Sequence, residues 1–279
     1  MDCLVCGRFR LSLARPLVMG IVNVTRDSFS GDGLADSGDP VLLALGQARR
    51  MVEEGADILD IGAESTRPGA EPVSLGEELG RIVPVVRALH ELGVPLSVDT
   101  SKPEVMIAAI AAGADMVNDV NALLAPGAVE AVAGSPVALC LMHMRGEPRS
   151  MQENPVYDDV LAEVAGFLAG RIRALEEAGI ERNRLTVDPG FGFGKTVAHN
   201  YELLARLKDI AFLGVPVLAG LSRKSMLGAV TGKPVGERLA ASVAAAVLAA
   251  ERGAAILRVH DVAETVDGLK ILNSVRGEG

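Results

Sequence analysis

The chain has 279 residues, enough for one large domain to bury most of its apolar surface. Hydrophobic residues make up 49% of it, the net charge is −9, and the absence of a lysine- and arginine-rich cluster argues against a nucleic-acid partner. The three cysteines, Cys3, Cys6 and Cys140, are too few and too scattered for a disulfide scaffold, which favours a reducing compartment.

The N-terminal segment lacks the basic stretch and apolar run of a signal peptide. Cys3 and Cys6 form one C-x-x-C pair without the second pair that zinc sites usually have, which favours two free thiols on an N-terminal hairpin over a metal or redox site. The longest apolar stretch, residues 240–250, is about half the length of a membrane span. We therefore expect a cytoplasmic protein without a membrane partner.

From residue 17 onward the sequence repeats one pattern. A short apolar run is followed by a polar or glycine-containing loop and then by a helical stretch. Such continuously apolar runs are typical of strands buried on both faces. The predicted strands cover residues 17–22, 58–61, 95–98, 116–118, 137–142, 185–187, 216–219 and 255–259. The predicted helices cover residues 40–54, 75–92, 103–112, 127–133, 157–178, 199–207, 236–252 and 262–274.

The ends of several predicted helices carry the residues that helix ends prefer. Pro103 stands in a first turn, where its missing N–H costs nothing. Glycines follow the helical stretches as C-terminal caps do, at Gly55, Gly93, Gly113, Gly179 and Gly253. Eight strands alternating with eight helices predict an α/β fold with a parallel sheet. The length favours a (β/α)8 TIM barrel with a short N-terminal hairpin-like segment over an open doubly wound sheet, and we expect residues 1–279 to form a single domain.

Polar residues follow each of the eight predicted strands, where barrel enzymes carry their chemistry. Taken singly, Asp99 is equally well explained as a helix cap and Asp188 as the start of a turn. Eight polar strand exits together favour a common site instead. They contribute Asn23, Glu64, Ser65, Thr66, Arg67, Pro68, Asp99, Asn118, Asp119, His143, Arg145, Asp188, Lys195, Ser222, Arg223, Lys224, Arg258, His260 and Asp261.

One group of these residues suits a nitrogen heterocycle. Asp99, Asn118 and Asp188 offer carboxylates and an amide to amino groups, ring N–H groups and a carbonyl. Lys224 is a point charge that could face a ring carbonyl or nitrogen. The stretch GFGFGK lacks the glycine spacing of a phosphate-binding P-loop, so we expect its Phe193 to lie over a ligand.

A second group suits an anion. Arg67 and Arg258 can each grip a phosphate through two parallel hydrogen bonds, and His260 stands beside Arg258 in the sequence. Asn23 offers a neutral oxygen to Mg²⁺ that is held mainly by substrate phosphates. Ser222 adds a short hydroxyl.

Eight segments resemble the signature segments of the dihydropteroate synthases and occur in the same order. The resemblance extends from about Leu17 to the C-terminus. The segments are MGIVNVTRDSFS, DIGAESTRPGA, SVDTSK, MVNDV, LMHMRG, VDPGFGFGKT, GLSRKS and RVHD. The resemblance implies a barrel enzyme of folate biosynthesis, usually a homodimer that uses Mg²⁺. Its substrates would be 6-hydroxymethyl-7,8-dihydropterin diphosphate and p-aminobenzoate, and its products 7,8-dihydropteroate and diphosphate.

The resemblance also implies a role for each matching residue. The pterin would be held by Asp99, Asn118, Asp188 and Lys224. The diphosphate and its Mg²⁺ would be handled by Asn23, Thr66, Arg67, Arg258 and His260. The p-aminobenzoate site, where sulfonamides also bind, would be shaped by Thr66, Arg67, Pro68, Phe193, Ser222 and Lys224. The residues expected to act in catalysis are Asn23, Arg67, Lys224, Arg258 and His260.

The first loop departs from the family pattern. Arg26 stands where the family has proline, and Gly31 stands where it has an aspartate thought to shield a cationic intermediate. Asp32 follows one residue later and could take over that task. Ala63 replaces a usual glycine, which adds one methyl group to a turn.

Two other function classes fit part of the pattern. A methyltransferase that passes a methyl group from methyltetrahydrofolate to a cobalamin protein would share the barrel and the pterin contacts but would need no diphosphate site. Arg67, Lys224, Arg258 and His260 favour the synthase over it. A non-catalytic pterin-binding protein would have a similar pocket but would release no diphosphate.

Overall fold

A closed barrel forms the centre of the computed structural model, which describes residues 2–25, 39–64, 72–146 and 151–277. Within these residues, eight parallel strands follow one another around the barrel, and the last pairs with the first. They are β3 (Leu17–Asn23), β4 (Ile58–Gly62), β5 (Leu96–Asp99), β6 (Met116–Asp119), β7 (Ala138–Met142), β8 (Leu185–Asp188), β9 (Val217–Ala219) and β10 (Ala254–Val259). The TIM barrel prediction is confirmed, and each strand lies within one residue of its predicted bounds.

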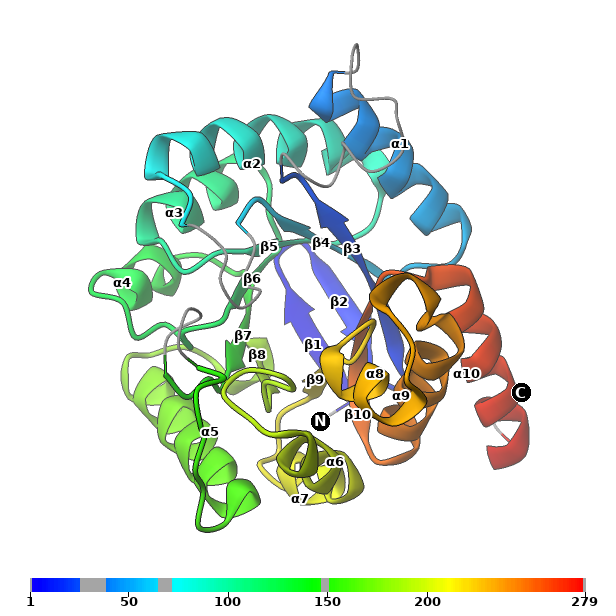
Figure 1. Cartoon of the computed structure of the whole chain (residues 1–279). Coiled ribbons are helices and arrows are strands. Elements are labelled where there is room, and N and C mark those ends of the chain that lie inside the picture. The colour runs from blue at the N-terminus through cyan, green and yellow to red at the C-terminus, as the bar shows by residue number, and fades with distance from the viewer. Residues whose placement is uncertain (1, 26–38, 65–71, 147–150, 278–279) are drawn as a thin grey trace.

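Helices surround the barrel (Figure 1). They are α1 (Pro40–Glu53), α2 (Leu75–Leu89), α3 (Pro103–Ala112), α4 (Ala128–Ala133), α5 (Val160–Glu177), α6 (Val197–Ala205), α7 (Leu207–Ala211), α8 (Ser225–Thr231), α9 (Leu239–Glu251) and α10 (Val262–Arg276). The glycines predicted as C-terminal caps all have a positive φ, which only glycine adopts without cost.

Several predicted helices differ from the observed ones by up to three residues at an end, and two larger differences concern the number of helices. The predicted helix over 199–207 is two helices, α6 and α7, because the backbone leaves the helical region at Arg206 (φ −107°, ψ 23°). Helix α8 was not predicted at all. Its seven residues include Gly228 and Thr231, which favour helix poorly, and it is stabilised by the burial of Met226 and Leu227 in the core.

The N-terminal segment is an antiparallel hairpin of β1 (Cys3–Cys6) and β2 (Phe9–Ser12). Leu4 and Cys6 are fully buried in one apolar cluster with residues near the starts of the barrel strands, such as Met19 and Met116. Figure 1 shows the hairpin across the middle of the ring of helices. The hairpin therefore covers the N-terminal end of the barrel, and only the C-terminal end is left for a site.

The larger core lies between the strands and the helices and is almost entirely aliphatic, with Phe191 as its fully buried aromatic residue. Cys140 is buried in the barrel interior. Among the described residues, no helix is both long and apolar enough to cross a membrane.

Candidate active site

The strand register brings the predicted residues together at the C-terminal end of the barrel. Asn23 pairs with Gly62, Gly62 with Asp99, and Asp99 with Asn118. A side chain at Gly62 would lie within 4.0 Å of both Asn23 Oδ1 and Asp99 Oδ2, so these two oxygens face one another across a residue that has no side chain. Glycine at this position keeps open the space between them.

Arg258 connects opposite sides of the barrel mouth. Its Nε donates to Asp60 Oδ2 at 2.6 Å, and its Nη2 donates to Asp99 Oδ2 at 2.8 Å. Burial lowers the pKa of the guanidinium, but the charges of Asp60 and Asp99 outweigh this and raise it. Arg258 therefore remains a cation within a largely buried group of carboxylates.

Asp60 is a site residue that the sequence analysis missed. It is fully buried in the middle of β4, where its Oδ2 accepts hydrogen bonds from Arg258 and from Asn118 Nδ2, the latter at 3.3 Å. Its Oδ1 is buried and has no partner among the described residues. Asp60 is a carboxylate inside an otherwise apolar predicted strand, and this pattern alone could have indicated a site residue. The prediction covered only polar residues at the ends of strands.

Burial raises the pKa of Asp99. The charge of Arg258 opposes this effect, whereas Asp60 and Asp119 add to it. Burial likewise raises the pKa of Asp188, although its Oδ1 accepts a hydrogen bond from the Gly190 N–H at 2.7 Å. These carboxylates lie in a site poor in water, where a ligand's N–H groups would be valuable partners.

The loop after β8 meets Lys224. The Lys224 ammonium donates to the carbonyl of Phe191 and lies 4.1 Å from the centre of the Phe193 ring. Burial lowers the pKa of Lys224 to about 8, with Asp188 opposing this and Arg258 adding to it. Lys224 and Phe193, which the sequence suggested for one ligand site, are therefore in contact.

Lys195 holds the same loop from inside. It is buried, and its ammonium donates to the carbonyls of Gly190 at 2.9 Å and Phe193 at 3.0 Å and lies 3.0 Å from His143 Nδ1. Burial lowers the pKa of Lys195 to about 7, and burial with the charge of Lys195 lowers that of His143 to about 3. Lys195 and His143 thus hold the loop after β8 in place, a role that the sequence did not reveal.

Ser222 and His260 form a pair. Ser222 Oγ lies 3.0 Å from His260 Nδ1 and also accepts a hydrogen bond from the His260 backbone N–H at 3.3 Å. The serine hydroxyl can therefore donate to Nδ1, which favours the imidazole form that carries its proton on Nε2.

The side chains around Asn23 decide whether a magnesium ion could bind there. Among the described residues, no group of three or more histidine, cysteine or acidic side chains could hold a metal ion by itself. Asn23 Oδ1 is an oxygen atom of the kind that Mg²⁺ prefers, whereas Asp99 Oδ2, on the other side of Gly62, is already paired with Arg258. A single oxygen of this kind fits an ion whose other ligands come from a substrate diphosphate.

Several predicted residues lie outside the described part of the chain. They are Arg26, Gly31, Asp32, Thr66, Arg67 and Pro68. Their predicted roles stay predictions.

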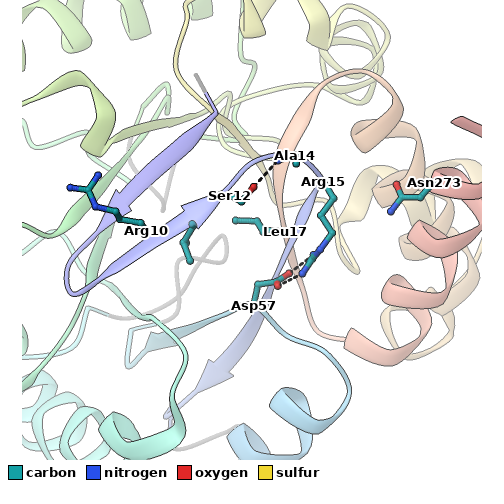
Figure 2. A pocket seen from close by; sticks show the side chains of 8 residues that line it. Arg10, Ser12, Ala14, Arg15, Leu17, Asp57 and Asn273 are labelled. Atoms are coloured by element: carbon teal, nitrogen blue, oxygen red, sulfur yellow. Dashed lines mark hydrogen bonds and ion pairs between the residues drawn. The ribbon is translucent and has the colours of Figure 1, made fainter. Parts of the chain in front are cut away.

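A hollow of about 650 Å³ lies on the other side of the barrel, beside the hairpin (Figure 2). In it, Arg15 holds the Asp57 carboxylate through two hydrogen bonds of 2.9 and 2.6 Å. None of the predicted site residues lines it, so it is separate from the candidate site. Its lining residues are Arg10, Leu11, Ser12, Ala14, Arg15, Leu17, Asp57 and Asn273.

The chain is similar to a known family and to several proteins of known function. The family model described as pterin binding enzyme matches residues 19–260. A dihydropteroate synthase of Escherichia coli (strain K12) is 49% identical over 265 residues, which are 95% of this chain and 93% of that protein. The solved structure of Xanthomonas albilineans dihydropteroate synthase with 4-aminobenzoic acid is 55% identical, with a TM-score of 0.92, and the match covers 99% and 98% of the two chains. That of the Burkholderia cenocepacia enzyme complexed with 7,8-dihydropteroate is 56% identical, with a TM-score of 0.89 and coverage of 99% and 97%.

Proposed function

The chain belongs to the family of pterin binding enzymes, and from this membership we infer that it catalyses the dihydropteroate synthase reaction of folate biosynthesis. It condenses 6-hydroxymethyl-7,8-dihydropterin diphosphate with p-aminobenzoate and yields 7,8-dihydropteroate and diphosphate. The observation that carries this conclusion is the 55% identity, over nearly the whole chain, to a synthase structure that holds 4-aminobenzoic acid. The methyltransferase and the non-catalytic binding protein have no comparable support.

We propose that the pterin binds between β5, β6 and β8. Asp99, Asn118 and Asp188 end these strands and present acceptors and an amide to its amino and ring N–H groups. Lys224 would release the Phe191 carbonyl and face the ring, because its ammonium lies close to Asp188 and contacts the Phe193 ring. Asp60 would hold Arg258 and Asn118 in place beneath the ring, since it contacts both.

The diphosphate is proposed to leave toward Arg258 and His260. Breaking the bond between the pterin methylene carbon and the diphosphate oxygen puts the electron pair on the diphosphate. The neutral amine of p-aminobenzoate then attacks that carbon and loses a proton. The Arg258 charge and an N–H of His260 would stabilise the departing oxygen atoms, and Ser222 would orient the imidazole. Thr66, Arg67 and Pro68, with Phe193, Ser222 and Lys224, are proposed to bind p-aminobenzoate.

We propose Mg²⁺ as the cofactor, with Asn23 as its protein ligand. When bound, the ion would neutralise part of the diphosphate charge. Asn23 suits this task because a neutral oxygen leaves the charge balance to the substrate.

We also propose a cytoplasmic homodimer. The three cysteines are free, which fits a reducing compartment. Helix α9 exposes Leu239 and Leu248, each 41% exposed, next to α10, which exposes Ile271 and Val275. A second copy of the chain could cover these apolar side chains.

Incubation with both substrates and Mg²⁺ tests the function. We expect equal amounts of 7,8-dihydropteroate and diphosphate, and loss of most turnover on chelation of Mg²⁺. His260→Ala should lower kcat by about 10²-fold, because one stabilising donor is lost at the leaving group. His90→Ala, at the hairpin end of the barrel where the ring contacts Arg8, serves as the matched control and should leave kcat unchanged. A folded wild-type protein that binds pterin but releases no diphosphate would contradict the proposal.

A further inference from the structure

Arg223 has a strained backbone between two of the proposed site residues. Its φ is +58°, in the left-handed region that every residue except glycine enters at a cost in free energy. Ser222 precedes it and contacts His260, and Lys224 follows it. Strain of this kind persists only where surrounding contacts maintain it. The contacts of Arg223 therefore decide how the two site residues beside it are placed.

Three neighbours hold Arg223 in this conformation. Its backbone N–H donates to the Oγ of the buried Ser242 on α9 at 2.9 Å, and its carbonyl accepts a hydrogen bond from Arg238 Nη1 at 3.0 Å. Its guanidinium donates twice to the Asp261 carboxylate, at 3.2 Å from Nε to Oδ2 and at 2.5 Å from Nη2 to Oδ1. The side chain of Arg223 is thus bound to the loop after β10.

Asp261 stands between His260 and α10, a position where aspartate ordinarily caps a helix. Its side chain makes no cap hydrogen bond here and accepts from Arg223 instead. The Arg223 side chain is 41% exposed, and an ion pair with this exposure adds little to the stability of a fold. Stability alone therefore does not account for the use of both residues in this contact.

Two adjacent contacts join the loop after β9 to the loop after β10. Ser222 Oγ lies 3.0 Å from His260 Nδ1, and the Arg223–Asp261 ion pair lies one residue further along both segments. Because the members of the two contacts are neighbours in the chain, fixing the ion pair restricts how Ser222 and His260 can approach one another.

We propose that the Arg223–Asp261 pair positions His260 for the departing diphosphate by holding Ser222 against the imidazole. Arg223 and Asp261 are positioning residues that act through His260, so the inference rests on the proposed role of His260 at the leaving group. Loss of the pair should slow turnover and leave pterin binding intact. Lys224 keeps its own contacts with the loop after β8, and the other proposed pterin contacts lie on other strands.

Steady-state kinetics of Arg223→Gly and Asp261→Ala test this proposal. Glycine adopts the left-handed conformation freely, so Arg223→Gly removes the ion pair without adding strain. Asp261→Ala removes it from the other side without the loss of a helix cap. We expect kcat to fall about tenfold in each variant, because a misaligned donor stabilises the leaving group less well. The two changes combined should lower kcat no further than either alone, since they break the same contact.

The variant His260→Ala separates positioning from general damage. Adding Arg223→Gly to His260→Ala should leave kcat at the value of His260→Ala, because the pair acts only through His260. The Kd of the pterin diphosphate, measured by calorimetry, should change less than about twofold in Arg223→Gly. Glu176→Ala is the matched control and should change neither constant, since it removes a surface ion pair with Arg182, whose side chain is also 41% exposed.

Three outcomes would overturn the inference. If His260→Ala lowers kcat and Arg223→Gly does not, the proposed function stands and the positioning role is wrong. An equal loss of kcat from Arg223→Gly with and without His260 would show damage that does not pass through the imidazole. An unchanged kcat in His260→Ala would contradict the proposed leaving-group role and, with it, the positioning role.

Discussion

The pKa values of charged side chains in the barrel mouth depend on burial as much as on their charged partners. Arg258 remains charged because Asp60 and Asp99 surround it, whereas burial lowers the pKa of Lys224 to about 8 despite the nearby Asp188. The two cations that the sequence placed in one site therefore differ in how they respond to pH. The guanidinium keeps its charge over the whole working range, and the ammonium does not.

This difference predicts a pH dependence of pterin binding. If Lys224 faces the pterin as a cation, the affinity should fall as the pH rises through about 8, by about tenfold for each further unit. The same lowered pKa acts on folding with the opposite sign, since the unfolded chain binds the proton more tightly and stability rises from pH 8 toward the ordinary lysine pKa. Calorimetric titration with a pterin between pH 6.5 and 9.5 measures the first effect.

The Lys224→Arg variant is the matched control, because a guanidinium remains charged throughout this range. Its affinity should be lower than that of the wild type but should not fall between pH 8 and 9.5, which lies above the raised pKa of Asp99, about 7. A wild-type affinity that is constant from pH 7 to 9.5 would show that the charge of Lys224 is not used for the pterin.

Among the elements of the fold, the loop from Gly190 to Lys195 depends most on exact packing. Its outer side brings Phe193 to Lys224, and its inner side is held by the buried Lys195 ammonium. Gly190 has φ +70°, and a Cβ there would lie 1.9 Å from the carbonyl oxygen of His143. The glycine is needed both for its backbone conformation and for the close approach of two chain segments.

Replacement of Gly190 by alanine should therefore destabilise the fold by more than the strain of a left-handed alanine alone. Gly179 provides the comparison, since its φ is +84° but a Cβ there would meet no atom within 4 Å. We expect Gly179→Ala to lower the free energy of unfolding by about 1 kcal/mol, the cost of a left-handed alanine. Gly190→Ala should cost at least about 3 kcal/mol, because overpacking adds to that strain.

Urea denaturation measures the free energies of unfolding of both variants. Activity assays should show a loss of activity for Gly190→Ala alone. Equal stability of the two variants would mean that the loop shifts freely away from His143.

At the scale of the whole molecule, the barrel has two unlike ends. The hairpin fills the N-terminal end with Leu4 and Cys6, and the C-terminal end gathers the charged residues around Arg258. The residues that stabilise the barrel therefore lie at its N-terminal end, and the residues proposed to bind substrates lie at its C-terminal end, as in other barrels of this kind. One exposed apolar face lies on α9 and α10, where Leu239, Leu248, Ile271 and Val275 are exposed.

This face predicts the assembly state. Sedimentation equilibrium should give twice the chain mass of 29.0 kDa, and Leu248→Asp on α9 should yield monomers, because a charge would be buried in the interface. Ile107→Asp is the control, since Ile107 is 55% exposed on α3, which lies across the barrel from α9 and α10 (Figure 1). A wild-type monomer at micromolar concentration would contradict the proposed homodimer.

The sequence by itself determined the barrel strands, the hairpin and most of the strand-end residues. Continuous apolar runs are bounded sharply by polar residues, and in a closed parallel barrel the strand ends must meet, so Asp99, Asn118 and Asp188 could be assigned to one end without coordinates. The split between α6 and α7 and the existence of α8 could not be predicted, because tertiary packing outweighs weak local preferences there.

Only the tertiary structure revealed how the site is supported. Asp60 and Lys195 are buried charged residues that each have a partner far away in the sequence: Arg258 lies 198 residues from Asp60, and His143 lies 52 residues from Lys195. Their roles depend on distances and on desolvation, and neither follows from the order of residues in the chain. The sequence could therefore indicate which chemistry the barrel mouth offers, whereas the folded structure decided which charges persist there and which side chains hold them in place.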